Sequence, residues 1–296
     1  MKFANTIISA AAGLAGAAYA SAARAGTGHA DPWQLGLQDA VTPSAHGIHS
    51  LHTFVLWMII IITLFVSGLL VYVMVKFNAK ANPVPSRTTH NSLIEVLWTV
   101  IPILVLVAMA IPSFRLLYLQ RDIPTNADMT LKVTGNPSWN WTYDYPDLGK
   151  NPDGSAKVSF SAYRLEKPEA EAAGEPYLLA TDVPVVVPVN KIVKLLVTSD
   201  PEGIIHAWTI PSFGMKIDAI PGRLNEDWFN AEKEGIYYGQ CSELCGKDHA
   251  FMPIEVWVVS GDKYKAWGDL MLKSPDDKTL KAFLGTIKPA AQLAQN

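Results

Sequence analysis

Two long apolar runs without charge constrain this chain more than any other feature of its sequence. The first covers residues 51–75 and the second covers residues 96–114, and neither contains Asp, Glu, Lys or Arg. At about 1.5 Å per helical residue, each run can cross roughly 30 Å of hydrocarbon. Pro102 and Pro112 lie in the second run, and membrane helices tolerate proline. The sequence therefore predicts a transmembrane helical hairpin over residues 51–115, rather than two buried helices of a soluble protein.

The charges around the two runs predict how the hairpin is oriented. The loop over residues 76–95 contains Lys76, Lys80 and Arg87 and no acid before Glu95, which indicates a cytoplasmic loop. Both ends of the chain then lie on the outer side of a bacterial inner membrane, in contact with membrane lipid only through the hairpin. Residues 26–50 are predicted to be a periplasmic segment that leads into it.

The first residues resemble an export signal. Lys2 precedes an alanine-rich apolar stretch over residues 7–19, which is too short to span a membrane, and two Ala-x-Ala patterns follow it. We expect a signal peptide over residues 1–25, with cleavage after Ala25. An uncleaved first helix is the alternative.

The chain changes character after the second run, where apolar stretches become short and β-branched. Stretches of this kind occupy residues 129–134, 183–189, 192–198 and 254–259, with turn residues between them. Short strands at close spacing predict an all-β sandwich or barrel over residues 116–262. Residues 160–174 are interpreted as a helical or loop-like insertion. One or two helices are expected over residues 263–283, within a C-terminal helix and tail that spans residues 263–296.

Charge is distributed unevenly between the hairpin and the β-domain. The whole chain carries a formal net charge of −3, but residues 116–296 contain 24 Asp and Glu against 18 Lys and Arg. An acidic exported face can attract a basic protein partner over long range, although a merely solvated surface is the simpler explanation for a mild excess. No nucleic-acid partner is expected.

The segment that indicates chemistry is a cluster of metal-binding residue types. Cys241, Cys245, His249 and Met252 fall within twelve residues, between stretches at 236–240 and 254–259 that are predicted to be strands. The cluster therefore lies on a loop of the β-domain, where binding sites are commonly built. A further histidine, His206, opens another short apolar stretch.

Three structures are compatible with two cysteines in an exported chain. A disulfide between Cys241 and Cys245 gives no role to the histidines or the methionine. A Cys₂His₂ zinc site leaves Met252 unused. Soft thiolate and thioether groups beside imidazoles favour copper, but a mononuclear blue-copper site uses one cysteine only. A dinuclear copper centre uses every group: two bridging thiolates, one histidine for each ion, and Met252 and the Glu243 carbonyl as weak ligands. With no open coordination position, such a centre would carry electrons rather than bind a substrate.

These motifs resemble subunit II of the haem–copper cytochrome c oxidases, the subunit with the dinuclear CuA centre. The resemblance extends over roughly residues 45–270, and its motifs follow in the family's order. They are Cys241-Ser-Glu-Leu-Cys245-Gly-x-x-His249-x-x-Met252-Pro253, His206-Ala-Trp208-Thr-Ile-Pro211, Ala180-Thr-Asp182 with Val185-Val-Val-Pro188, Pro221-Gly222-Arg223, and His90-Asn91-x-x-Ile94-Glu95 with Trp98-Thr99. The resemblance implies a cupredoxin-like β-domain. It also implies an electron-accepting subunit of an oxidoreductase complex of the respiratory chain, whose oxygen-reducing and proton-pumping site lies in catalytic subunit I.

The resemblance further implies roles for individual residues. Trp139 would accept electrons from a c-type cytochrome, although Gly135-Asn-Pro-Ser-Trp139-Asn-Trp141 is one residue longer than the family's aromatic motif. Glu243 would offer its carboxylate to a magnesium ion shared with subunit I, which suits a hard cation. Glu95 would lie at the mouth of a proton-uptake path, unless it is simply an acid at a helix N-terminus. Asp144 and Asp182 match acidic positions of the family and are the candidates for cytochrome docking.

Two other functions fit part of the sequence. A quinol oxidase subunit has the same fold but lacks the copper ligands, all of which this chain contains. A copper-delivery protein needs an accessible Cys-x₃-Cys pair, but it does not need the hairpin, Glu95 or the separate His206 motif. The sequence therefore favours the cytochrome c oxidase subunit over both.

Overall fold

The computed structural model describes residues 28–289, which form two compact units. One unit covers residues 47–121 and contains most of two long helices. The other combines residues 28–46 with residues 122–289. The predicted signal peptide over residues 1–25 and the last residues, 290–296, lie outside the described part of the chain.

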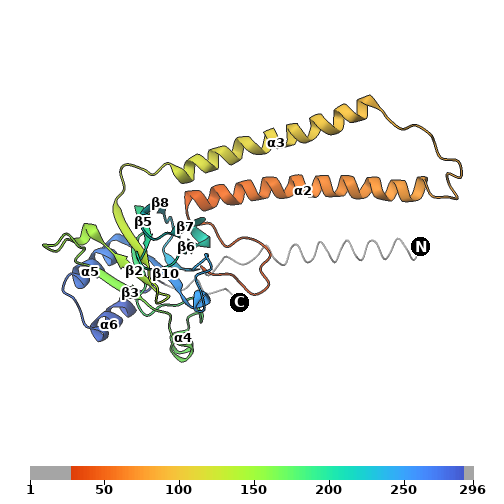
Figure 1. Ribbon diagram of the computed structural model, residues 1–296. Coiled ribbons are helices and arrows are strands. Elements are labelled where there is room, and N and C mark those ends of the chain that lie inside the picture. Colours follow the sequence, from red (N-terminus) through yellow and green to blue (C-terminus); the bar gives the residue numbers. More distant parts are fainter. Residues whose placement is uncertain (1–27, 290–296) are drawn as a thin grey trace. The chain divides into compact units, whose positions relative to one another are not determined.

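The long helices, α2 (Pro43–Lys76) and α3 (Ser92–Arg121), form an antiparallel hairpin (Figure 1). Both are long and apolar enough to cross a membrane. α2 begins earlier than the apolar run at residue 51 because a start signal precedes that run. The Thr42 hydroxyl accepts a hydrogen bond from the Ala45 backbone N–H at 3.1 Å, and Pro43 occupies the first helical position. The apolar run marks the membrane-spanning part of the helix and not its ends.

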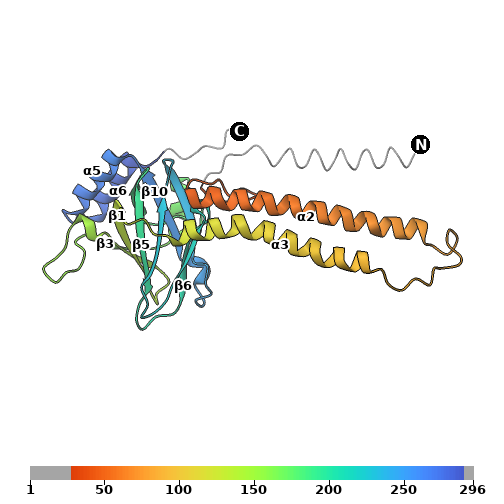
Figure 2. The same cartoon turned by 90° about the horizontal axis from the view of Figure 1, so that it is seen from above.

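The β-domain contains two main sheets and a two-stranded ribbon (Figure 2). The larger sheet has the order β3-β2-β1-β5-β8, the smaller has the order β4-β10-β9, and β6 pairs with β7. The β1–β5 and β4–β10 pairs are parallel, and the other pairs are antiparallel. The strands are β1 (Met129–Gly135), β2 (Trp141–Asp144), β3 (Ser159–Ala162), β4 (Val185–Pro188), β5 (Ile192–Ser199), β6 (His206–Ile210), β7 (Met215–Ala219), β8 (Asn225–Asn230), β9 (Gly235–Gln240) and β10 (Pro253–Val259).

Alternation of buried side chains explains how the two sheets share one core. In β1 every second residue is buried, so Leu131 and Val133 face inward while their neighbours are partly exposed. They belong to one hydrophobic cluster with Val256 and Val258 of β10 and the ring of Trp208. The hairpin and the β-sandwich confirm the predicted fold class.

The segment before α2 belongs to the β-domain. The Gly28 carbonyl accepts a hydrogen bond from the Tyr238 N–H of β9 at 2.9 Å. Val41 donates its N–H to Ser212 at 3.2 Å, and its carbonyl accepts from the N–H of Glu232 at 2.9 Å. Backbone hydrogen bonds at both ends of residues 28–42 therefore fasten this segment to the sandwich.

Three further helices lie around the sandwich. α4 (Lys167–Ala173) occupies the later part of the predicted insertion, whose first residues belong instead to β3, and α5 (Gly261–Met271) and α6 (Asp277–Ile287) follow β10. Side-chain caps start the last two: Ser260 accepts from the Lys263 N–H, and Asp276 accepts from the Thr279 N–H. The Trp267 ring of α5 is fully buried, 4.8 Å from the Tyr145 ring between centroids.

β10 carries a buried acid that the sequence analysis did not identify. Glu255 is 2% exposed and accepts hydrogen bonds from the Thr181 N–H at 2.7 Å and the Trp257 indole N–H at 2.6 Å. Lys288, which follows α6, pairs with the neighbouring Glu175. Burial, reinforced by the charge of Glu175, raises the pKa of Glu255 from 4.5 to about 8. Glu255 therefore keeps its proton at neutral pH.

The buried acid predicts how stability depends on pH. Above pH 4.5 the unfolded chain loses the Glu255 proton while the folded chain keeps it up to about pH 8, so stability should fall across this interval. At about 1.4 kcal/mol per pKa unit, the loss is on the order of a few kcal/mol. Glu255→Gln should flatten this slope, as measured by thermal unfolding of the detergent-solubilised chain from pH 4 to 9. Glu202→Gln, at an exposed position, is the control. Equal slopes in the Glu255→Gln and unmodified chains would contradict the assignment.

Candidate metal centre

The cysteine loop is held at both ends by one strand pair. Cys241 follows the last residue of β9, Met252 precedes the first residue of β10, and Gln240 pairs with Pro253 across the two strands. The Cys241 N–H also donates to the Met252 carbonyl at 3.3 Å. The antiparallel register therefore fixes where residues 241–252 leave and rejoin the sheet.

The three sulfur atoms of this loop lie together in a buried site. The Sγ atoms of Cys241 and Cys245 are 3.7 Å apart, and the Cys245 Sγ lies 3.6 Å from the Met252 Sδ. All three side chains are buried. A disulfide bond is about 2.05 Å long, so the two cysteines are free thiols at close range. Their separation leaves both sulfur atoms available as ligands.

Each thiol is accompanied by one histidine. The Nδ1 atom of His206 lies 3.8 Å from the Cys241 Sγ, and the Nδ1 atom of His249 lies 3.4 Å from the Cys245 Sγ. His206 is fully buried at the start of β6, whereas His249 is half-buried on the cysteine loop. The ligand atoms of His206, Cys241 and Cys245 all lie within 4.8 Å of one another. β6 thus brings a residue distant in sequence to the loop.

A glycine makes room for the buried imidazole. A Cβ atom built on Gly135, the last residue of β1, would lie 2.6 Å from the His206 Cδ2 atom. The indole of Trp141 also packs against the imidazole, with its centroid 5.7 Å from the imidazole centroid in an edge-on arrangement. Packing therefore limits the orientation of His206, as a metal ligand requires.

Burial shifts the pKa of two groups in the site. It raises the pKa of the Cys245 thiol to about 12, with a further contribution from the neighbouring Cys241. It lowers the pKa of His206, which keeps that imidazole neutral. Without a cation the Cys245 thiol holds its proton, so metal binding would release that proton. The donor set of two thiols, two imidazoles and a thioether fits copper better than zinc.

Glu243 presents two groups to different surroundings. Its backbone carbonyl accepts from the Cys241 thiol at 3.3 Å and therefore faces the sulfur cluster. Glu243 as a whole is half-buried, and its carboxylate makes no hydrogen bond or ion pair with any residue that the structure describes. The neighbouring Leu244 side chain is 81% exposed. The tip of the cysteine loop is therefore available to contact another protein.

Trp139 connects the outside of the domain with the cysteine loop. Its indole Nε1–H donates to the Cys245 carbonyl at 3.0 Å, and its ring packs beside Gly246. The side chain is partly buried, with the Lys247 Nζ 5.5 Å from the ring centroid. Trp141, in contrast, is fully buried, and its indole lies 3.4 Å from the Met252 carbonyl. Trp139 thus has the partly exposed position and Trp141 the core position.

The backbone at Trp139 is unusual. Its φ angle is +55°, in the left-handed region that bulky residues rarely adopt and that costs about 1–3 kcal/mol. A hydrogen bond from the Trp139 N–H to the Asn136 carbonyl at 3.1 Å holds the turn. Pro137 and Ser138 lie within this turn, and the indole that follows it bonds to the cysteine loop. No residue pattern around Trp139 predicts this backbone conformation.

The remaining predicted site residues make no contact with the sulfur cluster among the interactions of the described residues. Glu95 is in the first turn of α3, where its carboxylate accepts from the Asn91 N–H at 3.3 Å. Asp144 accepts from Lys132 at 3.2 Å and from Ser159 at 2.6 Å. Asp182 accepts from the Tyr163 and Val183 N–H groups at 2.8 Å each, and its burial raises the pKa of the carboxyl. All three carboxylates contribute to local structure.

Comparison with known proteins identifies the family. Residues 129–259 match the family model described as cytochrome c oxidase subunit II, periplasmic domain, and residues 30–116 match its transmembrane domain. Cytochrome c oxidase subunit 2 of Cereibacter sphaeroides is 43% identical over 290 residues, which cover 90% of this chain and 92% of that protein. A probable cytochrome c oxidase subunit 2 of Rickettsia bellii is 46% identical over 236 residues, or 80% and 83% of the two chains.

A solved structure covers the β-domain. The periplasmic domain of subunit II of the cytochrome oxidase of Bradyrhizobium japonicum is 47% identical and covers 51% of this chain and 98% of its own, with a TM-score of 0.45. The two family models match both the hairpin and the β-domain, so the protein is membrane-anchored, with a cupredoxin-like domain outside. The chain belongs to the subunit II family of haem–copper cytochrome c oxidases, which are multi-subunit oxidoreductases.

Proposed function

We propose that this chain accepts electrons from a c-type cytochrome at a dinuclear copper centre and passes them to haem in catalytic subunit I. There oxygen is reduced to water, coupled to proton pumping. The observation that carries the proposal is the pair of buried free thiols 3.7 Å apart, each with its own histidine. The complex does the oxygen chemistry, and this chain supplies the electrons.

The donor groups divide naturally between two copper ions. The two thiolates would bridge them, and His206 and His249 would each complete one ion. Met252 and the Glu243 carbonyl, beside Cys245 and Cys241 respectively, would be the weak ligands. When bound, the copper pair takes up and releases one electron at a time. The strand pair that holds the loop at both ends would keep the ligands in place through this change.

Trp139 is the proposed site at which the electron enters. Its partly exposed ring can contact a donor protein, while its indole N–H is bonded to the carbonyl of the ligand Cys245. This hydrogen bond is a direct connection from the outside of the domain to a copper ligand. Trp141 is enclosed by the core and is proposed to hold His206 in place.

The acidic charge of the exported part favours a basic cytochrome as partner. Its attraction would be long-range and would weaken as salt is added. Asp144 and Asp182 are retained as docking candidates. Because both accept hydrogen bonds within the domain, we propose that they act through their charge rather than as freely moving side chains.

Two further residues are proposed to act at the boundary with subunit I. The Glu243 carboxylate, which has no partner among the described residues, would supply one ligand to a shared magnesium ion, and subunit I would supply the others. Glu95, at the cytoplasmic end of α3, would lie at the mouth of a proton path. We place the protein in a bacterial inner membrane, with the copper domain in the periplasm.

Metal content tests the proposed function directly. The chain, purified from membranes in detergent after copper loading, should contain two copper ions, with one unpaired electron shared equally over both in the half-reduced state. Elemental analysis and electron paramagnetic resonance measure these two properties. One copper ion, or a zinc ion, would contradict the dinuclear centre and leave the function of the exported domain open.

A further inference from the structure

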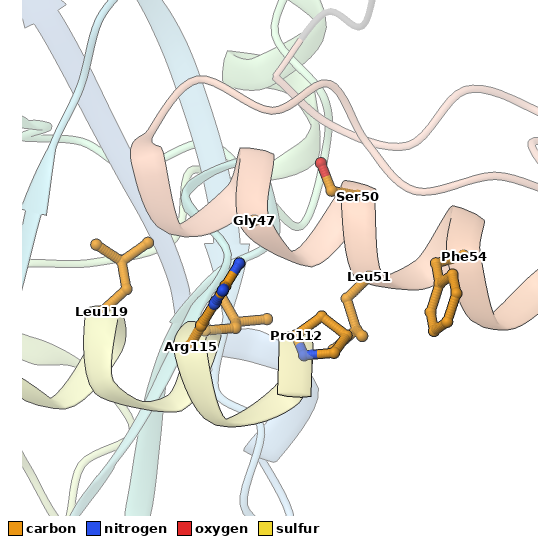
Figure 3. A pocket seen from close by; sticks show the side chains of 8 residues that line it. Gly47, Ser50, Leu51, Phe54, Pro112, Arg115 and Leu119 are labelled. Carbon is orange, nitrogen blue, oxygen red and sulfur yellow. The ribbon is translucent and has the colours of Figure 1, made fainter. Parts of the chain in front are cut away.

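A groove lies between the two helices of the hairpin, near the start of α2 and the end of α3. It has a volume of about 300 Å³ and is lined by the first turns of α2 and the last turns of α3. Leu51 and Phe54 contribute from α2, and Pro112, Leu116 and Leu119 contribute from α3 (Figure 3). The groove is mainly apolar, and Arg115 is the one charged residue in its lining.

Close approach of the helices shapes this groove. A Cβ atom added to Gly47 would lie 2.7 Å from the Leu116 Cδ1 atom, so glycine allows the two helices to meet there. From this point the helices diverge toward the cytoplasmic loop (Figures 1 and 2). Pro112, in the interior of α3, removes one backbone donor beside the groove. The helices are therefore closest near Gly47, and the groove lies along this part of the hairpin.

Arg115 has no counter-charge in the hairpin. Glu95 is the only acid among residues 47–121, and its twenty-residue separation from Arg115 along α3 corresponds to about 30 Å. No carboxylate of the described residues forms an ion pair with Arg115. Figure 3 shows its guanidinium directed toward α2 at Gly47. The groove thus holds an uncompensated cation with apolar walls.

The position of Arg115 matches the headgroup level of a bilayer. It is the first charged residue after the uncharged run at 96–114, which spans roughly 30 Å of hydrocarbon. A guanidinium at this depth is well suited to a phosphate, because its fork can donate two hydrogen bonds to phosphate oxygens. The apolar side chains of Leu51, Phe54 and Pro112 line the groove on the side of Arg115 that faces the hydrocarbon.

We propose that this groove binds one phospholipid of the outer leaflet, with its phosphodiester on Arg115 and an acyl chain along Leu51, Phe54 and Pro112. The charge of Arg115 and the apolar character of the walls match the two parts of such a molecule. The proposal does not depend on the copper centre, because it concerns the hairpin alone.

Lipid retention tests this proposal on the assembled oxidase. The complex is purified in a mild detergent, and tightly bound phospholipids are counted by native mass spectrometry. The unmodified complex should keep one phospholipid that the Arg115→Leu complex loses. The control is Arg121→Leu, which removes one charge from the last turn of the same helix, outside the groove lining. The Arg121→Leu complex should keep the phospholipid. Equal counts in the unmodified and Arg115→Leu complexes would overturn the proposal and indicate that another subunit fills the groove.

A second measurement uses the unmodified chain, in case the Arg115 variant does not assemble. The purified complex is mixed with phosphatidylglycerol that carries a photoreactive group on an acyl chain, and is then illuminated. Cross-linked peptides should include residues 47–54 or 112–119, and excess unlabelled phosphatidylglycerol should reduce their yield. Cross-links to this chain that fall only on other parts of the hairpin would contradict the site.

Discussion

The His206→Asn chain is expected to bind one copper ion instead of two and to lose the signal of an electron shared between them. His206 is fully buried, and its imidazole lies beside Cys241, so its loss removes the nitrogen ligand next to that thiol. Loss of a residue that only hydrogen-bonds to a metal ligand lowers metal affinity about 10–100-fold. Loss of a direct ligand should therefore lower copper affinity at least about 100-fold. Electron transfer from cytochrome c should fall with the loss of the second ion.

Copper analysis and electron paramagnetic resonance of the purified variant measure both effects. His90→Asn removes a histidine from the segment before α3 and should leave copper content and spectrum unchanged. Circular dichroism separates loss of metal from loss of fold. An unchanged spectrum with two copper ions in the His206 variant would remove His206 from the site.

The Trp139→Phe chain is expected to keep both copper ions but to accept electrons from cytochrome c at least about tenfold more slowly, equivalent to about 1.4 kcal/mol of activation free energy. Phenylalanine keeps an aromatic ring but lacks the indole N–H that binds the Cys245 carbonyl. That hydrogen bond is worth about 1 kcal/mol, so the loop should stay folded. The effect should therefore be on electron transfer and not on metal binding.

Stopped-flow mixing with reduced cytochrome c measures this rate. A small inorganic reductant should reduce the variant at the normal rate, because it does not need the tryptophan contact. Trp33→Phe, at a side chain that is 98% exposed elsewhere on the chain, is the matched control. A normal rate with cytochrome c would move the electron-accepting role to Trp141 or to another residue.

The parts of this protein that depend on local sequence were predictable. The length of the two uncharged apolar runs indicated the hairpin, because a bilayer sets the length of the helix that crosses it. The β-branched stretches indicated β1, β4, β5 and β10, all of which have largely buried positions. The metal-binding residue types also lie close together in sequence, except for His206. These features require no knowledge of which segments meet in space.

The features that depend on distant contacts were not predicted. β2, β3, β7 and β8 include polar residues and are defined by pairing with neighbouring strands. Glu255 lies in an apolar strand pattern, and only Thr181, Trp257 and the Glu175–Lys288 pair explain how its burial is tolerated. The left-handed backbone at Trp139 depends on its tertiary surroundings. Periodicity and spacing carry no information about such contacts.

The packing of the first residues against β9 affects how this protein can be made. Because residues 28–46 and 122–289 form one compact unit, the hairpin is an insertion within the exported domain. At about 5–20 residues per second, the ribosome needs roughly 10–40 s after Gly28 to reach the β9 strand with which it pairs. If α3 failed to insert, the two portions of the domain would remain on opposite sides of the membrane. Correct insertion of the second helix is therefore a precondition for assembling the copper ligands.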